Sequence, residues 1–181
     1  MIDKKDLRKL QTKALSKGRA KTTEEGNVLL EKLAQEPEWQ NAQSIATTVS
    51  NLFEVPTKPI IERALSEGKQ VYLPKTMPHR QMAFLPFSSY DDLVVSAYGI
   101  PEPVYQADLV ERQPDLVLVP GVAFSTSDRY RVGFGGGYYD RFLAQYQGKT
   151  VALVPSIMEF ADSDWPVEEF DMQIDKLITL D

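Results

Sequence analysis

The sequence predicts an α/β fold in which a largely parallel sheet is sandwiched between helices. Three observations lead to this class. Strand-like segments alternate with helix-like ones along most of the 181 residues. Two strand-like segments, 115–120 and 150–155, are apolar almost throughout, as in strands covered on both faces. A hydrophobic content of 43% in a chain of this length can bury a sizeable core, and we expect one domain spanning residues 1–181.

The first 35 residues are expected to be helical. One face of a 3.6-residue period is approximated by Leu7, Leu10, Ala14 and Leu15, which indicates a first helix. A second helix is expected to begin at Thr22, because Thr22 and Glu25 form the T-x-x-E capping-box pattern before an apolar run.

The rest of the chain alternates between the two patterns. Helices are expected at 56–68, ended by Gly68, and at 138–148, ended by Gly148, since glycine commonly follows the last turn of a helix. The Pro-rich stretch 98–108 is expected to cross the surface. Strands are expected at 44–49, 70–74, 82–87, 115–120, 150–155 and 175–180.

Charge and composition exclude several classes of protein. The net charge of −6 argues against a general nucleic-acid binder, which needs a surplus of Lys and Arg. The charge is uneven, because residues 1–21 carry a net +6 and the remaining residues −12. With no Cys and one His, the chain can form no disulfide, thiolate nucleophile or multi-His metal site. No apolar run has the length of a membrane span or a signal-peptide core, so we expect a cytoplasmic protein that binds no membrane.

Residues 131–140, RVGFGGGYYD, hold four of the chain's ten glycines. We expect them between a buried strand and a helix, at the carboxyl edge of the sheet, where open α/β folds bind ligands. Bare glycine backbone lets a ligand approach the amide N–H groups, and a helix N-terminus adds partial positive charge, so an anion such as phosphate fits. The chain has no G-x-x-x-x-G-K-[ST] motif, and G-F-G-G-G-Y departs from the dinucleotide fingerprint. A plain glycine turn closing the crossover is the alternative.

The residues that flank the glycines favour phosphate binding. Arg131 can hold phosphate oxygens with its guanidinium fork, and Tyr138 and Tyr139 offer flat faces to a heterocycle. Asp140 is a hard oxygen ligand suited to Mg²⁺. The alternative is that the tyrosines pack in the core and that Asp140 caps the first turn of the helix.

Lys4 and Arg8 are four residues apart and therefore share one face of the first helix. Like charges at that spacing repel by about 0.2–0.5 kcal/mol, and an anion bound between them would reverse the sign. A solvated, lysine-rich helix surface is the alternative interpretation.

The glycine segment belongs to a longer pattern, PGVAF (120–124) followed by RVGFGGGYYDRFL (131–143). This pattern resembles the signature of the 5-formyltetrahydrofolate cyclo-ligases, also called 5,10-methenyltetrahydrofolate synthetases. Three shorter stretches agree with it in order along the chain. KKDLR (4–8) resembles the family's K-x-x-L-R, EVPT (54–57) its E-[VI]-x-T, and DMQID (171–175) its D-x-x-[VI]-D. The resemblance covers essentially the whole chain.

The resemblance implies a three-layer α/β/α, Rossmann-like fold and an enzyme that requires ATP and Mg²⁺. The implied reaction closes 5-formyltetrahydrofolate to 5,10-methenyltetrahydrofolate, with release of ADP and phosphate. It proceeds by phosphorylation of the formyl oxygen and attack by N10. Phosphoryl transfer of this kind needs mainly positioning and charge neutralisation from the protein.

The matching motif positions imply a set of site residues. Lys4 and Arg131 would act in catalysis by neutralising phosphate oxygens, and Asp140 and Asp175 resemble the Mg²⁺ ligands. Without the resemblance, Glu54 would be interpreted as a charge at the N-terminus of the helix at 56–68. The implied ATP-binding residues are Lys4, Lys5, Asp6, Leu7, Arg8, Arg131, Val132, Gly133, Phe134, Gly135, Gly136, Gly137, Tyr138 and Tyr139. The implied folate-binding residues are Val49, Glu54, Phe134, Gly135, Gly136, Gly137 and Tyr138.

The chain departs from the family pattern at two places. STSDRY (125–130) replaces the family's Asp-x-x-Gly turn, and Gly136 stands where some members have a lysine. Two other functions fit the same pocket: a nucleotide- or folate-binding regulator without turnover, and an ATP-dependent enzyme acting on another N-acyl substrate. We expect a monomer, or at most a weak homodimer. His79 is interpreted as an exposed loop residue, and Trp165 as a side chain tucked against the core.

Overall fold

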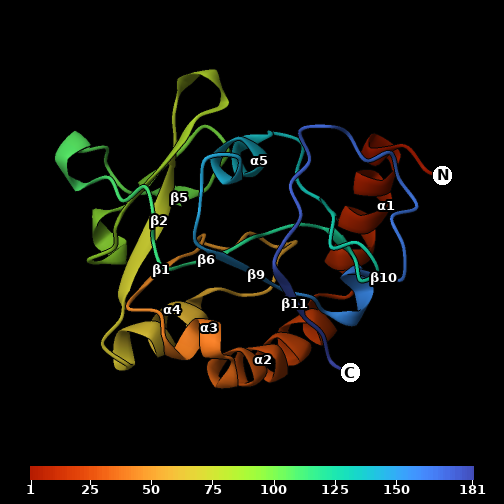
Figure 1. The fold of residues 1–181 in the computed structure, drawn as a ribbon, viewed down its shortest axis with the longest axis horizontal. Helices are drawn as coiled ribbons and strands as arrows, with labels where there is room; N and C mark the ends of the chain where they lie inside the picture. The colour runs from red at the N-terminus through yellow and green to blue at the C-terminus, as the bar shows by residue number, and fades with distance from the viewer.

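A six-stranded sheet runs through the middle of the molecule in the computed structural model, which describes all 181 residues (Figure 1). All neighbouring strands pair in parallel except β2 and β3, which form an antiparallel hairpin. The prediction of a largely parallel sheet is therefore confirmed. In spatial order the strands are β11 (Lys176–Ile178), β9 (Lys149–Leu153), β6 (Leu116–Leu118), β1 (Ser44–Ala46), β2 (Gln70–Thr76) and β3 (Met82–Pro86).

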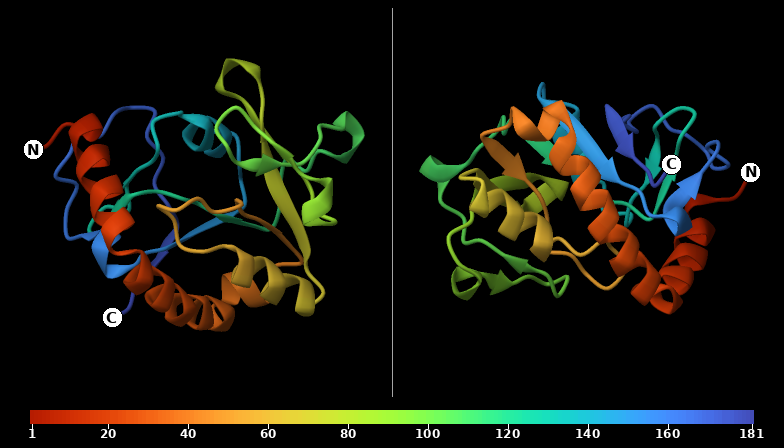
Figure 2. Two further views of the ribbon diagram at one scale, coloured as in Figure 1. Left: turned by 180° about the vertical axis from the view of Figure 1, so that it is seen from behind. Right: turned by 90° about the horizontal axis from the view of Figure 1, so that it is seen from below.

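Helices cover both faces of this sheet. On one face lie α2 (Arg19–Gln35), α3 (Pro37–Gln40) and α4 (Lys58–Ser66) (Figure 2). On the other lie α1 (Lys4–Lys17) and the short α5 (Tyr138–Leu143). Side chains alternate between the faces along each strand, so that Ile45 and Val71 join one apolar core while Ala46 and Tyr72 join the other. Two cores on opposite faces of one sheet confirm the three-layer α/β/α architecture.

Short strands form two additional sheets. The three-stranded sheet contains β10 (Glu159–Phe160), β7 (Ala123–Ser125) and β8 (Arg131–Val132), and the two-stranded sheet contains β4 (Val94–Val95) and β5 (Pro101–Glu102). None of these strands is longer than three residues, which is too short for a recognisable alternation. The STSDRY stretch forms the turn between β7 and β8, where the Arg129 N–H donates to the Ser125 carbonyl at 2.9 Å. Four 3₁₀ turns complete the elements: Pro78–Arg80, Tyr90–Asp92, Ala107–Leu109 and Ser156–Met158.

Two expectations for the first helices are wrong. The second helix begins at Arg19, so Thr22 lies inside it and donates its hydroxyl to the Gly18 carbonyl at 3.1 Å. The Glu25 carboxylate accepts the N–H and hydroxyl of Ser156 instead of closing a capping box. Leu10 is exposed, and Gln11 takes the buried position, where its amide donates to two backbone carbonyls.

The later helices and strands mostly agree with prediction in type and place, and most are shorter than predicted, although β2 extends to Thr76. The helix predicted at 138–148 ends at Leu143, so Gly148 does not cap it. The β7–β8 hairpin separates β6 from the glycines, so the strand does not lead directly into them. Gly68 follows the end of α4 with a φ of 75°, as a C-terminal glycine should. Trp165 is buried in the core, and His79 is exposed in the turn at 78–80. No helix is both long enough and apolar enough to span a membrane.

Candidate functional site

The chain changes direction at the centre of the sheet. From β1 it continues to β2 on one side, whereas β6 lies on the other side of β1. The segments that follow β1 and β6 therefore separate at the carboxyl edge, which is where doubly wound sheets bind ligands.

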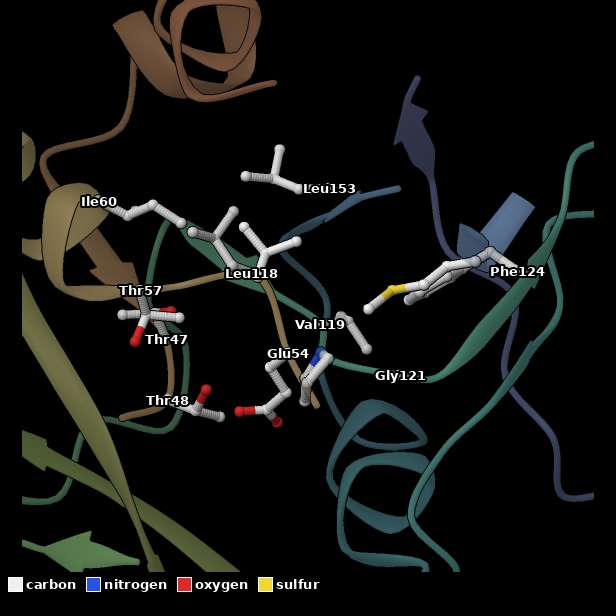
Figure 3. Close-up of a pocket in the computed structure, with 13 residues that line it drawn as sticks. Thr47, Thr48, Glu54, Thr57, Ile60, Leu118, Val119, Gly121, Phe124 and Leu153 are labelled. Carbon is white, nitrogen blue, oxygen red and sulfur yellow. The ribbon is translucent and has the colours of Figure 1, made fainter. Parts of the chain in front are cut away.

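A pocket with about 430 Å³ of space, partly open to solvent, lies at this point. Thr48 and Glu54 line it from the segment after β1, and Val119 and Gly121 line it from the segment after β6 (Figure 3). In Figure 3 the Glu54 carboxylate lies beside Thr48, at the polar end of the pocket and away from its apolar end. That apolar end is formed by Ile60, Leu118 and Leu153.

Glu54 lies in a tight turn between β1 and α4 and is only 7% exposed. The Asn51 N–H donates to its carboxylate at 2.8 Å, and Arg19 donates to its backbone carbonyl at 2.8 Å. Ser50 and Thr57 close the turn with reciprocal bonds between hydroxyl and backbone N–H. Burial raises the pKa of Glu54 from 4.5 to about 7, against the opposing effects of the Asn51 N–H and the Arg19 charge. Near neutral pH this carboxyl can both hold and release a proton.

This raised pKa predicts a pH-dependent cost to stability. Between pH 4.5 and 7 the unfolded chain loses the Glu54 proton while the folded chain keeps it, so the folded state is progressively destabilised as pH rises. Glu54→Gln cannot ionise and should be the more stable protein by about 3 kcal/mol at pH 8, with almost no difference at pH 4. Urea unfolding at both pH values measures this. An unchanged difference between the two proteins across this range would show that Glu54 has an ordinary pKa.

The glycine loop, defined here as residues 133–137, has a backbone that requires glycine. Gly135 and Gly137 have φ values of 97° and 74°, in the left-handed region where a β-carbon is strained. A β-carbon at Gly136 would come within 2.7 Å of the Tyr138 ring. The amides of residues 134–137 donate no hydrogen bond within the protein. Four free N–H groups on bare backbone suit an anion with several oxygens.

Two arginines from separate parts of the sequence hold the glycine loop. Arg8 donates from Nε to the Gly133 carbonyl at 2.8 Å, and Arg80 donates from Nη1 to the Gly136 carbonyl at 3.0 Å. In a trans peptide the next N–H points away from the carbonyl. Each arginine therefore fixes the direction of one free N–H of the loop.

Arg131 lies beneath the glycine loop with a side chain only 5% exposed. Its Nη2 is 3.5 Å from Oδ1 of Asp140, and its guanidinium lies 5.9 Å from the centre of the Tyr139 ring. Both Nε of Arg131 and the hydroxyl of Tyr139 are buried with no hydrogen-bond partner. Each unsatisfied donor costs about 1–3 kcal/mol, which a ligand with acceptor oxygens could recover.

Tyr139, two residues after the glycine loop, has a buried hydroxyl and lies beside Arg131. Burial raises the pKa of its hydroxyl far above the usual range, with the Glu54 charge adding to the shift and the Arg131 charge opposing it. The Tyr139 ring packs edge-on against Phe84, with 6.4 Å between the ring centres.

Tyr138 differs from its neighbour because it lies on the surface. Its hydroxyl is 2.8 Å from that of Tyr98, and the two rings meet edge-on at 81°. Phe134, on the glycine loop, is 43% exposed. Tyr138 and Phe134 can therefore present aromatic surface to a ligand above the loop.

The other predicted residues of α1 are divided between core and surface. Lys4 forms ion pairs with Asp171 and with Glu168, in the acidic segment near the C-terminus, and does not contact the glycine loop. Leu7 is buried in the core, as is Val132, whereas Lys5 and Asp6 are exposed. Val49 is half-buried and packs against the core under α4, next to the pocket but not lining it. Of the α1 residues, only Arg8 reaches the loop.

The two predicted metal ligands have different surroundings. One oxygen of Asp140 accepts the Met172 N–H at 3.2 Å and faces Arg131. One oxygen of Asp175 accepts both the N–H and the hydroxyl of Thr150, at 2.9 and 3.0 Å. No contact joins the two carboxylates, and the chain has no cluster of three or more His, Asp or Glu side chains that could hold a metal. The assignment of Asp140 and Asp175 as metal ligands therefore stays a prediction.

Sequence reasoning missed three residues of this site: Arg19, Arg80 and Tyr98. Each acts through a contact with a residue far away in the sequence, which no local pattern reveals. The sequence around them offered no signal, and it is the structure that marks Arg80, since His79 and Arg80 both adopt positive φ values, of 61° and 60°. Left-handed backbone at residues other than glycine is costly and often marks functional sites.

Comparison with known proteins identifies the family. The family model of the 5-formyltetrahydrofolate cyclo-ligase family matches residues 2–180. A probable 5-formyltetrahydrofolate cyclo-ligase from Caenorhabditis elegans is 31% identical, over 97% of this chain and 91% of the relative. The 5-formyltetrahydrofolate cyclo-ligase of Escherichia coli is 33% identical, over 76% of this chain and 78% of the relative.

Two solved structures are also similar to this chain. The NMR structure of the 5,10-methenyltetrahydrofolate synthetase of Aquifex aeolicus superposes with a TM-score of 0.81 at 29% identity. The superposition covers 97% of this chain and 89% of that one. A 5,10-methenyltetrahydrofolate synthetase from Mycoplasma pneumoniae shares the fold, with a TM-score of 0.73 at 22% identity over 98% of both chains.

Proposed function

The chain belongs to the 5-formyltetrahydrofolate cyclo-ligase family, an enzyme family of folate metabolism, and we propose that it has this activity. In the proposed reaction it closes 5-formyltetrahydrofolate to 5,10-methenyltetrahydrofolate and converts ATP to ADP and phosphate. We propose that it does so as a single cytoplasmic domain, in a monomer or weak homodimer, with Mg²⁺ bound beside the phosphates. The alternative of a binding protein without turnover has no observation in its favour.

One observation supports the proposal: the glycine loop and the residues on either side of it have hydrogen-bond donors without partners. These donors are the amides of residues 134–137, the buried Nε of Arg131 and the buried hydroxyl of Tyr139. A triphosphate supplies the acceptor oxygens that these donors lack, and Arg8 and Arg131 supply positive charge. Lys4 would join them by exchanging Asp171 for a phosphate oxygen.

The chemistry explains why the phosphates and the folate need adjoining sites. The γ-phosphoryl group of ATP moves to the formyl oxygen: its P–O bond to the β-phosphate breaks, ADP leaves, and a new P–O bond to the formyl oxygen forms. N10 of the folate then attacks the formyl carbon and loses its proton, and the C–O bond breaks to release phosphate. The products are therefore 5,10-methenyltetrahydrofolate, ADP and phosphate. The protein's part is to align these groups and neutralise their charge.

Glu54 is the candidate for recognition of the folate. Its carboxyl has one oxygen held by the Asn51 N–H, and it faces the pocket beside Thr48. With a pKa of about 7 it can accept a hydrogen bond from a ring N–H or take up a proton. Phe134 and Tyr138 would provide aromatic contact above the glycine loop, and Val49 supports the pocket from behind.

Mg²⁺ fits the carboxylates of Asp140 and Asp175, each of which has one oxygen without a partner. Each would offer one oxygen to the ion, and phosphate oxygens and water would supply the other ligands. When bound, the ion neutralises charge on the phosphate oxygens.

The proposal is tested by mixing the pure protein with ATP, Mg²⁺ and 5-formyltetrahydrofolate and following methenyl absorbance. The expected result is one methenyl product per ADP released, with no product when ATP is omitted. Binding of both ligands without product would favour a regulator. Turnover of other N-acyl compounds, with none of the folate, would favour a different substrate.

A further inference from the structure

Glu102 is a buried carboxylate to which the proposed reaction gives no part. It lies on β5 beside the end of β2, and only 3% of the residue is exposed (Figure 1). Its carboxylate accepts the Thr76 N–H at 3.2 Å, and the Thr76 hydroxyl lies 3.0 and 2.9 Å from its two oxygens. The Lys75 ammonium group is 3.1 Å from one of these oxygens. Hydrogen bonds to a charged group are the stronger kind, so Glu102 attaches β5 firmly to the end of β2.

The β4–β5 hairpin brings Tyr98 to the glycine loop. The two strands pair in antiparallel register, and Tyr98 lies in the turn between them. The Ser96 N–H closes this turn by donating to the Ile100 carbonyl at 2.9 Å. At the tip the Tyr98 hydroxyl is 2.8 Å from that of Tyr138, the residue that follows the glycine loop. Because a two-stranded hairpin is marginally stable by itself, the position of Tyr98 depends on what holds β5.

The end of β2 brings Arg80 to the same region. After β2 the chain forms the turn at 78–80, which the Met77 N–H closes by donating to the Gln81 carbonyl at 2.8 Å. From this turn, with a φ of 60°, Arg80 donates to the Gly136 carbonyl at 3.0 Å. Left-handed backbone at a residue other than glycine persists only where the surrounding chain is held in place. The bonds at the end of β2 provide that support.

We propose that Glu102 is a positioning residue. By joining β5 to the end of β2, it sets where Tyr98 and Arg80 meet the glycine loop and the first residue of α5. Glu102 does not line the pocket at the carboxyl edge of the sheet, so it acts through these two side chains. The inference rests on the proposed function, because the glycine loop is the proposed phosphate site.

The test measures KM and kcat for ATP and for 5-formyltetrahydrofolate in Glu102→Ala. Loss of a hydrogen-bonded charge should raise each KM about tenfold, while kcat falls by less than about threefold because no reacting group is touched. Glu102→Gln keeps an oxygen that can accept the Thr76 N–H, and each KM should stay within about threefold of wild type. Asp115→Ala is the control and should change neither KM. The Asp115 carboxylate also joins two segments, by accepting the N–H groups of Gln43 and Ser44, but it does so at the amino edge of the sheet.

A double-mutant cycle separates positioning from a general loss of stability. In a protein that already carries Tyr98→Ala and Arg80→Ala, adding Glu102→Ala should change each KM by less than about twofold, because its effect is transmitted by those two residues. A further rise of about tenfold in that background would overturn the inference, as would wild-type KM values in Glu102→Ala alone. If Glu102→Ala does not fold, Thr76→Val replaces it in the cycle. That variant removes one hydroxyl donor and should raise each KM about threefold.

Failure of the proposed function is a different result, because the wild-type protein would then form no methenyl product. Calorimetric titration with a non-hydrolysable ATP analogue, without folate, still tests the role of Glu102 in that case. Glu102→Ala should bind the analogue about tenfold more weakly than wild type. Equal affinities would refute the positioning role, and a wild-type protein that binds no analogue would overturn both the role and the phosphate site.

Discussion

Arg131→Ala should lower kcat/KM for ATP by about 100- to 1,000-fold, the loss expected when a positioned donor to transition-state charge is removed. The free energy of unfolding should change by less than about 2 kcal/mol, because two effects oppose each other. The variant loses the contact with Asp140, but it also loses a buried Nε that has no partner. Steady-state kinetics and urea unfolding measure the two quantities.

Arg129→Ala is the matched control, since Arg129 lies in the same hairpin but donates to the Ile174 carbonyl instead of facing the site. The Arg129→Ala variant should have a kcat/KM for ATP within about threefold of the wild-type value. Arg131→Lys keeps the charge without the guanidinium fork and should recover only part of the activity. An unchanged kcat/KM for ATP in Arg131→Ala would remove Arg131 from the phosphate site.

Gly136→Val should lower kcat/KM for ATP by at least about 100-fold and weaken nucleotide binding in equilibrium titrations. The added β-carbon would come within 2.7 Å of the Tyr138 ring, and the branched side chain would cover backbone that the phosphates must approach. Both effects disturb the glycine loop while its flanking arginines remain.

Gly148→Val provides the control for steric strain alone. A β-carbon there would also collide with a tyrosine ring, that of Tyr146, but beyond the end of α5 and away from the glycine loop. It should lower the melting temperature and leave the affinity for nucleotide unchanged. Normal nucleotide affinity in Gly136→Val would contradict the role assigned to the glycine loop.

The strands of the central sheet could be predicted because each leaves a local pattern. Buried strands such as β6 and β9 are short apolar runs, and their alternation with helices indicates a parallel sheet. The small sheet of β7, β8 and β10 could not be predicted, because its two- and three-residue strands are held by pairing with distant segments. The capping box at Thr22 and Glu25 was misleading for the same reason: Glu25 serves a tertiary contact with Ser156.

The residues of the site also divide into those that a local sequence pattern reveals and those that it does not. The glycine loop and Arg131 are visible as a sequence motif, since positive φ and close approach restrict the residue types that are tolerated. The contacts that shape the site are not visible: Arg8 with Gly133, and Arg80 with Gly136, join residues more than 50 positions apart. The raised pKa of Glu54 likewise depends on burial, which the sequence of the turn does not encode.

The central claim is that the site joins the γ-phosphoryl group of ATP to the formyl oxygen of the folate. Labelling that oxygen with ¹⁸O and analysing the released phosphate by mass spectrometry tests it most directly. The account predicts one ¹⁸O atom in each phosphate formed with methenyltetrahydrofolate. Phosphate that carries only oxygen from ATP and solvent would contradict it.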